Sequence, residues 1–306
     1  MTQELVIVGT PQYPLGGTLT LPDNIAQPVP AVVFVHGSGS SNMDEKVGAL
    51  TPFKDLAEGL AKHGIASLRY DKRTYKYGFK MAKKGGITVR EETIEDAILA
   101  RKLLEEDSRI DKNRIFIAGH SMGGMLAPRI DAEGGDFRGL ILLAGSPRTL
   151  RQILQVQTSQ MVEGSKGIKK WIMKKQVRKI MAGFDNFDSI TDEEAKTRKF
   201  GAGVTMYYFK EMEAHPTEKY LAETDKPMLI MQGDKDFQCT TALDFMKYKE
   251  LLSGRDNVTF RLYDDLNHCF VPAIYDSIAA GAKEYKTERH IGENVIKDMA
   301  DWIKEA

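Results

Sequence analysis

The alternation of short apolar strands with longer amphipathic helices is the feature that most constrains the fold of this chain. Residues 31–35 form a continuous run of β-branched and aromatic residues, the kind of strand that is buried on both faces of a sheet. A helix follows, with Thr51 as its N-cap, Pro52 at its first position and Gly64 after its end. Further strands are expected over residues 65–70, 114–118, 140–144, 228–231 and 258–263, and further helices over 90–106 and 290–303. This order predicts an α/β fold with a mostly parallel central sheet and helices on both faces.

Residues 146–226 interrupt this alternation. They show no strand pattern over about eighty residues, which is too long for a loop in a compact domain, and they are helical in character and rich in Met, Lys and aromatic residues. We therefore predict that 146–226 is an inserted helical cap and that residues 1–145 and 227–306 together form the core. The cap is expected to cover the carboxyl ends of the strands, where open α/β sheets bind ligands.

The composition argues against several classes of protein. The 43 Lys and Arg residues of this 306-residue chain balance its 43 Asp and Glu residues, which argues against a nucleic-acid partner. No apolar run approaches the roughly 18 residues needed to span a bilayer, and the first residues lack the pattern of a signal peptide. With two cysteines and no cluster of zinc-like spacing, we expect neither a disulfide framework nor a metal or other cofactor. The expectation is a cytoplasmic globular enzyme or binding protein without stable membrane insertion, for which a homodimer stays open.

Ser121 stands in the sequence Gly119-His-Ser-Met-Gly123, between a buried strand and a helix. In a nucleophile elbow a serine occupies a strained turn, and small residues two positions before and after it let the strand and the helix approach closely. The same residues would also fit a simple Gly-rich turn, so the surrounding strand and helix carry the prediction. We predict that Ser121 is the catalytic nucleophile.

A serine nucleophile needs a base, and the base needs an acid that orients it. Asp236 follows the strand at 228–231 and His268 follows the strand at 258–263, so both should lie at the same edge of the sheet as Ser121. The chain order Ser, Asp, His is the one that accompanies this elbow. Asp234 is the alternative acid, but it directly follows a tight turn, where an aspartate more often caps backbone amides.

The tetrahedral intermediate of acyl transfer needs two N–H donors aimed at its oxyanion. Met122 should supply one as the residue after the nucleophile, and the glycine-rich loop after residue 35 should supply the other. We favour Ser38 because glycines flank it, with Gly37 and Gly39 as alternatives. Aromatic residues of the predicted cap are candidates for the walls of a substrate pocket that holds an acyl chain or an aromatic ring. These candidates are Trp171, Tyr207 and Tyr208.

Two charged segments have both a structural and a functional interpretation. Residues 166–179 are basic with interleaved apolar positions. This segment either attracts an anionic substrate or membrane surface, or is a solvated helix whose apolar stripe covers the site. Residues 69–73 follow a strand and could reach the site. We expect them to join the strand end to neighbouring loops through ion pairs.

Together these residues resemble the serine-dependent α/β-hydrolase superfamily, and more narrowly the bacterial acyl and cinnamoyl or feruloyl esterases, close to prolyl-oligopeptidase-type hydrolase domains. The resemblance extends beyond the triad to several blocks of sequence, over residues 35–39, 53–57, 64–74, 119–124 and 266–268. It implies an α/β-hydrolase fold with Ser121 as nucleophile, Asp236 as acid and His268 as base. The segments 40–44 and 269–288 depart from the pattern of the nearest relatives, so the resemblance leaves the ester open.

The predicted activity is the hydrolysis of small-molecule carboxylic esters, with short to medium acyl or hydroxycinnamoyl groups, through an acyl-enzyme. The alternative enzyme is an aminopeptidase or acylaminoacyl-type peptidase with the same triad. It would need an acidic clamp for a free amine, for which Glu211 and Glu213 are candidates. A third hypothesis is a ligand sensor or acyl-binding protein that uses the same pocket without turnover.

Overall fold

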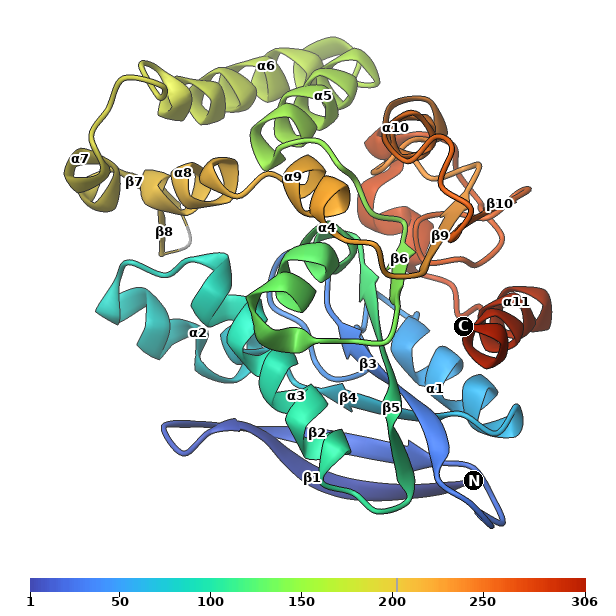
Figure 1. Cartoon of the computed structure of the whole chain (residues 1–306). Helices are drawn as coiled ribbons and strands as arrows, with labels where there is room; N and C mark the ends of the chain where they lie inside the picture. The colour runs from blue at the N-terminus through green and yellow to red at the C-terminus, as the bar shows by residue number, and fades with distance from the viewer. Residues whose placement is uncertain (202) are drawn as a thin grey trace.

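The protein is built around one eight-stranded sheet (Figure 1). The computed structural model describes residues 1–201 and 203–306. The strands run in the spatial order β1-β2-β4-β3-β5-β6-β9-β10. Their bounds are β1 Thr2–Thr10, β2 Tyr13–Leu21, β3 Val29–Val35, β4 Ala66–Tyr70, β5 Ile110–His120, β6 Leu140–Leu143, β9 Met228–Gly233 and β10 Val258–Tyr263. From β4 to β10 all neighbours are parallel, and only β1–β2 and β2–β4 pair antiparallel. The prediction of a mostly parallel sheet is confirmed.

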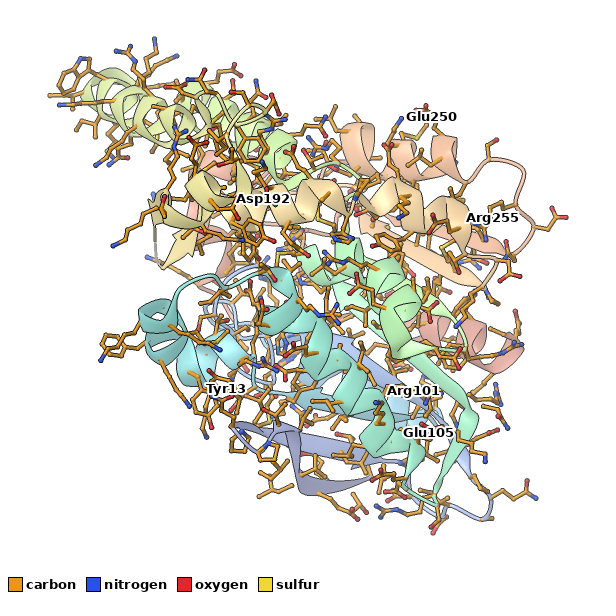
Figure 2. The ribbon with its side chains drawn as sticks, turned by 60° about the vertical axis from the view of Figure 1, so that its left-hand side comes forward. Tyr13, Arg101, Glu105, Asp192, Glu250 and Arg255 are labelled. Carbon is orange, nitrogen blue, oxygen red and sulfur yellow. The ribbon has the colours of Figure 1, made fainter. Side chains whose placement is uncertain are left out.

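Helices cover both faces of the sheet, because its central strands are apolar on both sides. In β3, Val33 and Val35 pack toward the layer that contains α3 and α4, whereas Val32 and Phe34 pack toward α1 and α11. The core helices are α1 Pro52–Lys62, α2 Arg73–Lys84, α3 Glu95–Glu105, α4 Met122–Ile130, α10 Met246–Leu251 and α11 Glu293–Glu305. Arg101 and Glu105 of α3 form an ion pair in which Glu105 is the more exposed partner (Figure 2). Because successive side chains of β3 point to opposite faces of the sheet, this one strand contributes to two hydrophobic layers.

Helix boundaries differ in detail from those expected. Thr51 is the N-cap of α1 and Pro52 is its first residue, although the Thr51 side chain makes no capping hydrogen bond. The helix predicted over residues 90–106 begins with a π-helical turn, Arg90–Ile94, before α3. Helix α2 was not expected from the sequence, since its residues carry few apolar positions. Among the described residues, no helix is both long and apolar enough to cross a membrane.

The segment after β6 forms a separate layer of helices above the carboxyl ends of the central strands (Figure 1). Its elements are α5 Leu150–Glu163, α6 Gly167–Met181, α7 Asp192–Thr197, α8 Met206–Ala214 and α9 Thr217–Glu223, with a short hairpin of β7 Lys199–Gly201 and β8 Val204–Thr205. The hairpin corrects the expectation that this segment holds no strand. Its strands have three and two residues, which is too short to produce an alternating pattern that sequence reading detects.

Candidate active site

Ser121 occupies the turn between β5 and α4, with a left-handed backbone at φ 54° and ψ −116°. A Cβ on Gly123 would overlap the carbonyl of Val35, and a Cβ on Gly119 would overlap the backbone of Gly123 itself. Glycine at both positions therefore lets α4 start directly against β3 and β5. A non-glycine residue with positive φ at such a junction is strained backbone, which is common where a side chain must be presented for chemistry.

His268 and Asp236 form a buried pair in the loops after β10 and β9. His268 Nδ1 lies 2.7 Å from Asp236 Oδ2, and both residues are almost fully buried. The carboxylate is held from its other side, since Asp236 Oδ1 accepts hydrogen bonds from the amides of Gln238 and Cys239 at 2.7 and 3.0 Å. Asp234, the alternative acid, instead accepts from the Asp265 amide at 2.7 Å. The geometry joins Asp236, rather than Asp234, to the histidine.

The histidine loop is tied to the nucleophile turn through His120. His120 Nε2 lies 2.8 Å from the backbone oxygen of His268, and the two imidazole rings are 4.6 Å apart between centroids. Because His120 directly precedes Ser121, this contact holds His268 beside the elbow. Among the described residues, no hydrogen bond joins the Ser121 hydroxyl to the His268 ring. In serine hydrolases without substrate this serine–histidine hydrogen bond is often long, and it tightens when substrate binds.

Glu45 is a buried carboxylate beneath the site that sequence reasoning missed. It lies 3.0 Å from His120 Nδ1 and accepts a 2.6 Å hydrogen bond from the Gly37 amide. Burial by itself would raise the pKa of Glu45, but His120, His36 and the Gly37 amide outweigh burial and lower it. Burial by itself would lower the pKa of His120, but the Glu45 carboxylate outweighs burial and the pKa of His120 is raised. Each of these two buried groups therefore favours the charged form of the other, and together they link the glycine loop to the nucleophile turn.

The two residues predicted to supply the oxyanion donors line the same cavity as Ser121. Ser38 and Met122 both line it, and the amide of neither residue donates a hydrogen bond to another described residue. Met122 is the first residue of α4, so its N–H also carries the partial positive charge of a helix N-terminus. The Gly37 amide, one of the alternatives, is already bound to Glu45. Of the three residues predicted as the second donor, only Ser38 and Gly39 therefore keep an amide that is not engaged by another described residue.

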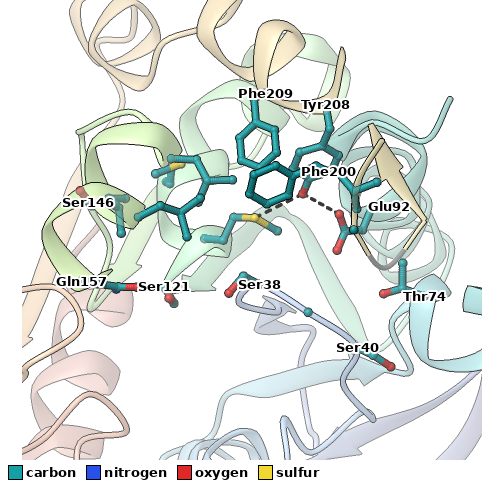
Figure 3. A pocket seen from close by; sticks show the side chains of 18 of the residues that line it. Ser38, Ser40, Thr74, Glu92, Ser121, Ser146, Gln157, Phe200, Tyr208 and Phe209 are labelled. Carbon is teal, nitrogen blue, oxygen red and sulfur yellow. Dashed lines mark hydrogen bonds between the residues drawn. The ribbon is translucent and has the colours of Figure 1, made fainter. Parts of the chain in front are cut away.

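The cavity above Ser121 has a volume of about 660 Å³. In Figure 3, Tyr208, Phe209 and Phe200 lie on one side of it, opposite Ser38 and Ser121. Most of its wall is aliphatic or aromatic, and the apolar lining residues are Ile87, Met122, Met125, Leu150, Ile153, Leu154, Phe200, Val204, Tyr208 and Phe209. The polar lining includes one carboxylate, that of Glu92, and no Lys, Arg or His side chain among the described residues. Such a cavity fits a neutral ligand that is largely apolar.

Only one of the three aromatic residues expected in the pocket wall is found there. Tyr208 lines the cavity, but Tyr207, the next residue of α8, does not. Trp171 is 65% exposed on α6, a helix with no buried residue whose side chains extend away from the rest of the molecule in Figure 2. We therefore leave Trp171 and Tyr207 out of the candidate site. An apolar stripe in a helical sequence does not show whether that stripe packs against the core or faces solvent.

The fold and this site define an α/β-hydrolase, and comparisons with known proteins place the chain within that class. Residues 26–271 match the family described as serine aminopeptidase, S33, and the chain belongs to this family. It is 33% identical over 289 residues to Esterase EstD of Thermotoga maritima. That match covers 94% of the chain but 65% of the relative, so the chain spans less than two thirds of the length of EstD.

Solved structures of esterases share the fold at low sequence identity. Est1E from Butyrivibrio proteoclasticus with ferulic acid bound superposes with a TM-score of 0.61 at 16% identity, covering 98% of both chains. The Pyrococcus furiosus esterase Pf2001 superposes with a TM-score of 0.58 at 15% identity, over 99% of this chain and 91% of that one. At these identities the likeness concerns the fold.

Proposed function

We propose that the protein is a carboxylic-ester hydrolase that works through a Ser121–His268–Asp236 triad. The Ser121 hydroxyl attacks the acyl carbon while His268 Nε2 takes its proton, and the amides of Ser38 and Met122 hold the oxyanion. His268 then gives this proton to the leaving alcohol, and an acyl-enzyme ester remains on Ser121. Water, deprotonated by the same histidine, cleaves the acyl-enzyme and restores the serine. Asp236 keeps the Nδ1 proton of His268 in place throughout.

The observation that carries this proposal is the 2.7 Å contact between His268 Nδ1 and Asp236 Oδ2, beside a strained Ser121 that opens onto a cavity. An imidazole whose Nδ1 faces a carboxylate has Nε2 free to act as a base. The esterase activity in the name of EstD and the ferulic acid bound to Est1E support the same chemistry.

The substrate we propose is a neutral ester with a short to medium acyl chain or a hydroxycinnamoyl group. An anionic acyl group finds no cationic side chain among the described residues of the cavity wall. We also propose that residues 146–226 act as a cap that shapes this cavity over the core formed by 1–145 and 227–306. Phe200, Tyr208 and Phe209, all from this segment, support that role because they line the wall opposite Ser121.

A serine aminopeptidase is the second candidate, and the family description favours it. Such an enzyme needs a free carboxylate for the substrate ammonium, but Glu211 is paired with Arg129 and Glu213 with Arg151, and neither lines the cavity. Glu92 does line it, but its two oxygens are engaged, one by Lys72 at 2.7 Å and the other by Tyr208 at 2.6 Å. These contacts favour an ester over a peptide with a free amine.

Hydrolysis of p-nitrophenyl acetate, butyrate, octanoate and ferulate, compared with Ser121→Ala, tests the proposal. We expect ester turnover that is lost in Ser121→Ala and kept in Ser40→Ala, a matched control because Ser40 also lines the cavity. Aminoacyl anilides run in parallel should be poor substrates. Turnover of the anilides alone would replace the esterase by the peptidase, and tight ester binding without turnover would favour a ligand sensor.

A further inference from the structure

The peptide bond between Gly37 and Ser38 is held by buried charges that the triad does not include. Lys72 Nζ donates a 2.8 Å hydrogen bond to the backbone oxygen of Gly37, while the preceding amide of Gly37 donates to Glu45. The N–H of Ser38, the proposed oxyanion donor, belongs to the same peptide unit as the Gly37 carbonyl. A lysine therefore binds one end of a peptide dipole whose other end belongs to Ser38, a residue that lines the cavity.

Lys72 is buried in the turn between β4 and α2, with 2% of its surface exposed. Its ammonium also lies 2.7 Å from Glu92 Oε1, so the buried charge has a counterion. Lys72 is not part of the cavity wall, which means that it acts on the reaction only through its neighbours. The sequence led us to expect an ion pair for this segment, and the contact with the glycine loop is what the structure adds.

The trans geometry of the peptide bond turns this contact into a constraint on the oxyanion site. The C=O and N–H of one peptide unit are coplanar and point in opposite directions, so a fixed Gly37 oxygen fixes the direction of the Ser38 N–H. A cation on the carbonyl oxygen also draws electron density from the peptide nitrogen. The N–H thereby becomes a stronger donor, as hydrogen-bonded chains polarise one another in a low-dielectric interior.

We propose that Lys72 is a positioning residue that orients and polarises the Gly37–Ser38 peptide so that the Ser38 amide stabilises the oxyanion. This inference rests on the proposed function. Tyr208 of α8 extends the chain of contacts, because its hydroxyl donates to Glu92 Oε2 at 2.6 Å (Figure 3). The cap is thus connected to the Ser38 amide through Tyr208, Glu92 and Lys72. A shift of Tyr208 in the cavity wall therefore changes the position of the Gly37–Ser38 peptide.

The test compares the wild type with the double variant Lys72→Met/Glu92→Gln, which removes the ion pair as a unit. The double variant leaves no unpaired buried charge, which keeps the fold intact better than Lys72→Met or Glu92→Gln alone. We expect the double variant to lose about 10- to 100-fold in kcat with KM little changed, since removal of a whole oxyanion donor costs 10²–10³-fold. Lys226→Met, which removes another ion-paired lysine outside the cavity, is the control for folding.

A second readout separates positioning from structural support. A trifluoromethyl ketone, which forms a tetrahedral adduct on Ser121, should lose affinity in the double variant by the same factor as kcat/KM. A substrate-like alkyl amide without the adduct should bind unchanged. Equal kcat and ketone affinity in the wild type and the double variant would overturn the role of Lys72 while leaving the esterase in place. An inactive wild type would instead refute the proposed function. If the double variant does not fold, Lys72→Gln/Glu92→Gln is compared with the wild type by the same criteria.

Discussion

Asp236→Asn is the substitution for which the site geometry makes the sharpest prediction. The carboxylate accepts four hydrogen bonds, from His268 Nδ1, Gln232 Nε2 and the amides of Gln238 and Cys239. An asparagine offers one oxygen for these four donors. In either orientation of the asparagine side chain, its NH₂ group faces two of these donors. One orientation reduces the rate, and the other reduces the stability of the fold.

If the NH₂ group faces His268, the imidazole must accept at Nδ1 and carry its proton on Nε2, where it cannot take the proton of Ser121. The rate loss expected for such a tautomer change is about 10⁴-fold, equivalent to about 5 kcal/mol. If the NH₂ group instead faces the amides of Gln238 and Cys239, two buried N–H groups lose their acceptor. That orientation lowers the free energy of unfolding by about 2–6 kcal/mol.

The assay measures kcat on p-nitrophenyl butyrate together with the free energy of unfolding in urea. We expect kcat to fall by 10³-fold or more, because the orientation that keeps the active His268 tautomer is the more costly and is therefore sparsely populated. Asp234→Asn is the matched control, since its carboxylate caps the Asp265 amide at the neighbouring turn and should change kcat less than threefold. Retention of a tenth of the activity in Asp236→Asn, or a larger loss in Asp234→Asn, would refute the assignment of the acid.

Three further predictions concern the elbow, a buried histidine and the cavity. Gly123→Ala should lower kcat at least 100-fold and reduce Tm, because the added Cβ would overlap the Val35 carbonyl. Gly78→Ala, where a Cβ meets open space, should change neither kcat nor Tm noticeably. Initial rates measure kcat and circular dichroism measures Tm for both variants. Burial lowers the pKa of His36 from 6.5 to about 4, so the unfolded state takes up the proton first as the pH falls. Urea unfolding should therefore show wild type losing about 3 kcal/mol relative to His36→Gln between pH 6.5 and 4, and parallel profiles would contradict this. Leu154→Trp should fill the cavity and cut octanoate turnover relative to acetate about tenfold, while Trp171→Ala, outside the wall, should leave the chain-length profile unchanged.

The elements around the triad could be predicted from the sequence because their signals are local. Short apolar runs identify buried strands, and the carboxyl ends of parallel strands meet at one edge of a sheet. That reasoning brought Asp236 and His268 together, and the structure pairs them at 2.7 Å. Asp236 was favoured over Asp234 because an acid directly after a tight turn was expected to cap backbone amides. In the structure both carboxylates accept from backbone amides, and Asp236 differs in that its second oxygen also meets His268.

The supporting charges could not be predicted, because they connect segments that are distant in sequence. Lys72 meets the Gly37 carbonyl across 35 positions and Tyr208 meets Glu92 across 116. Isolated charged residues give no periodic pattern in the sequence, and a charged side chain is usually expected to be exposed to solvent. Glu45 is a further case, a buried acid in a loop whose residues read as an irregular connection.

The predicted cap shows the limit of helical periodicity. One of the two interpretations of residues 166–179 was a helix whose apolar stripe covers the active site, but Ile168, Trp171 and Ile172 of α6 are exposed. An amphipathic pattern identifies a helix and its two faces, while the choice of which face packs depends on neighbouring helices. Tyr208 reaches the cavity because α8, rather than α6, is the helix that packs beside it.

The most direct test of the central claim is peptide mapping by mass spectrometry after reaction with diethyl p-nitrophenyl phosphate. This reagent phosphorylates an activated serine and leaves its phosphoryl group attached. We predict one diethylphosphoryl group per chain, on the peptide that contains Ser121, with loss of ester hydrolysis in proportion to labelling. Labelling at another residue, or full hydrolysis by a protein labelled at Ser121, would contradict the assignment of the nucleophile.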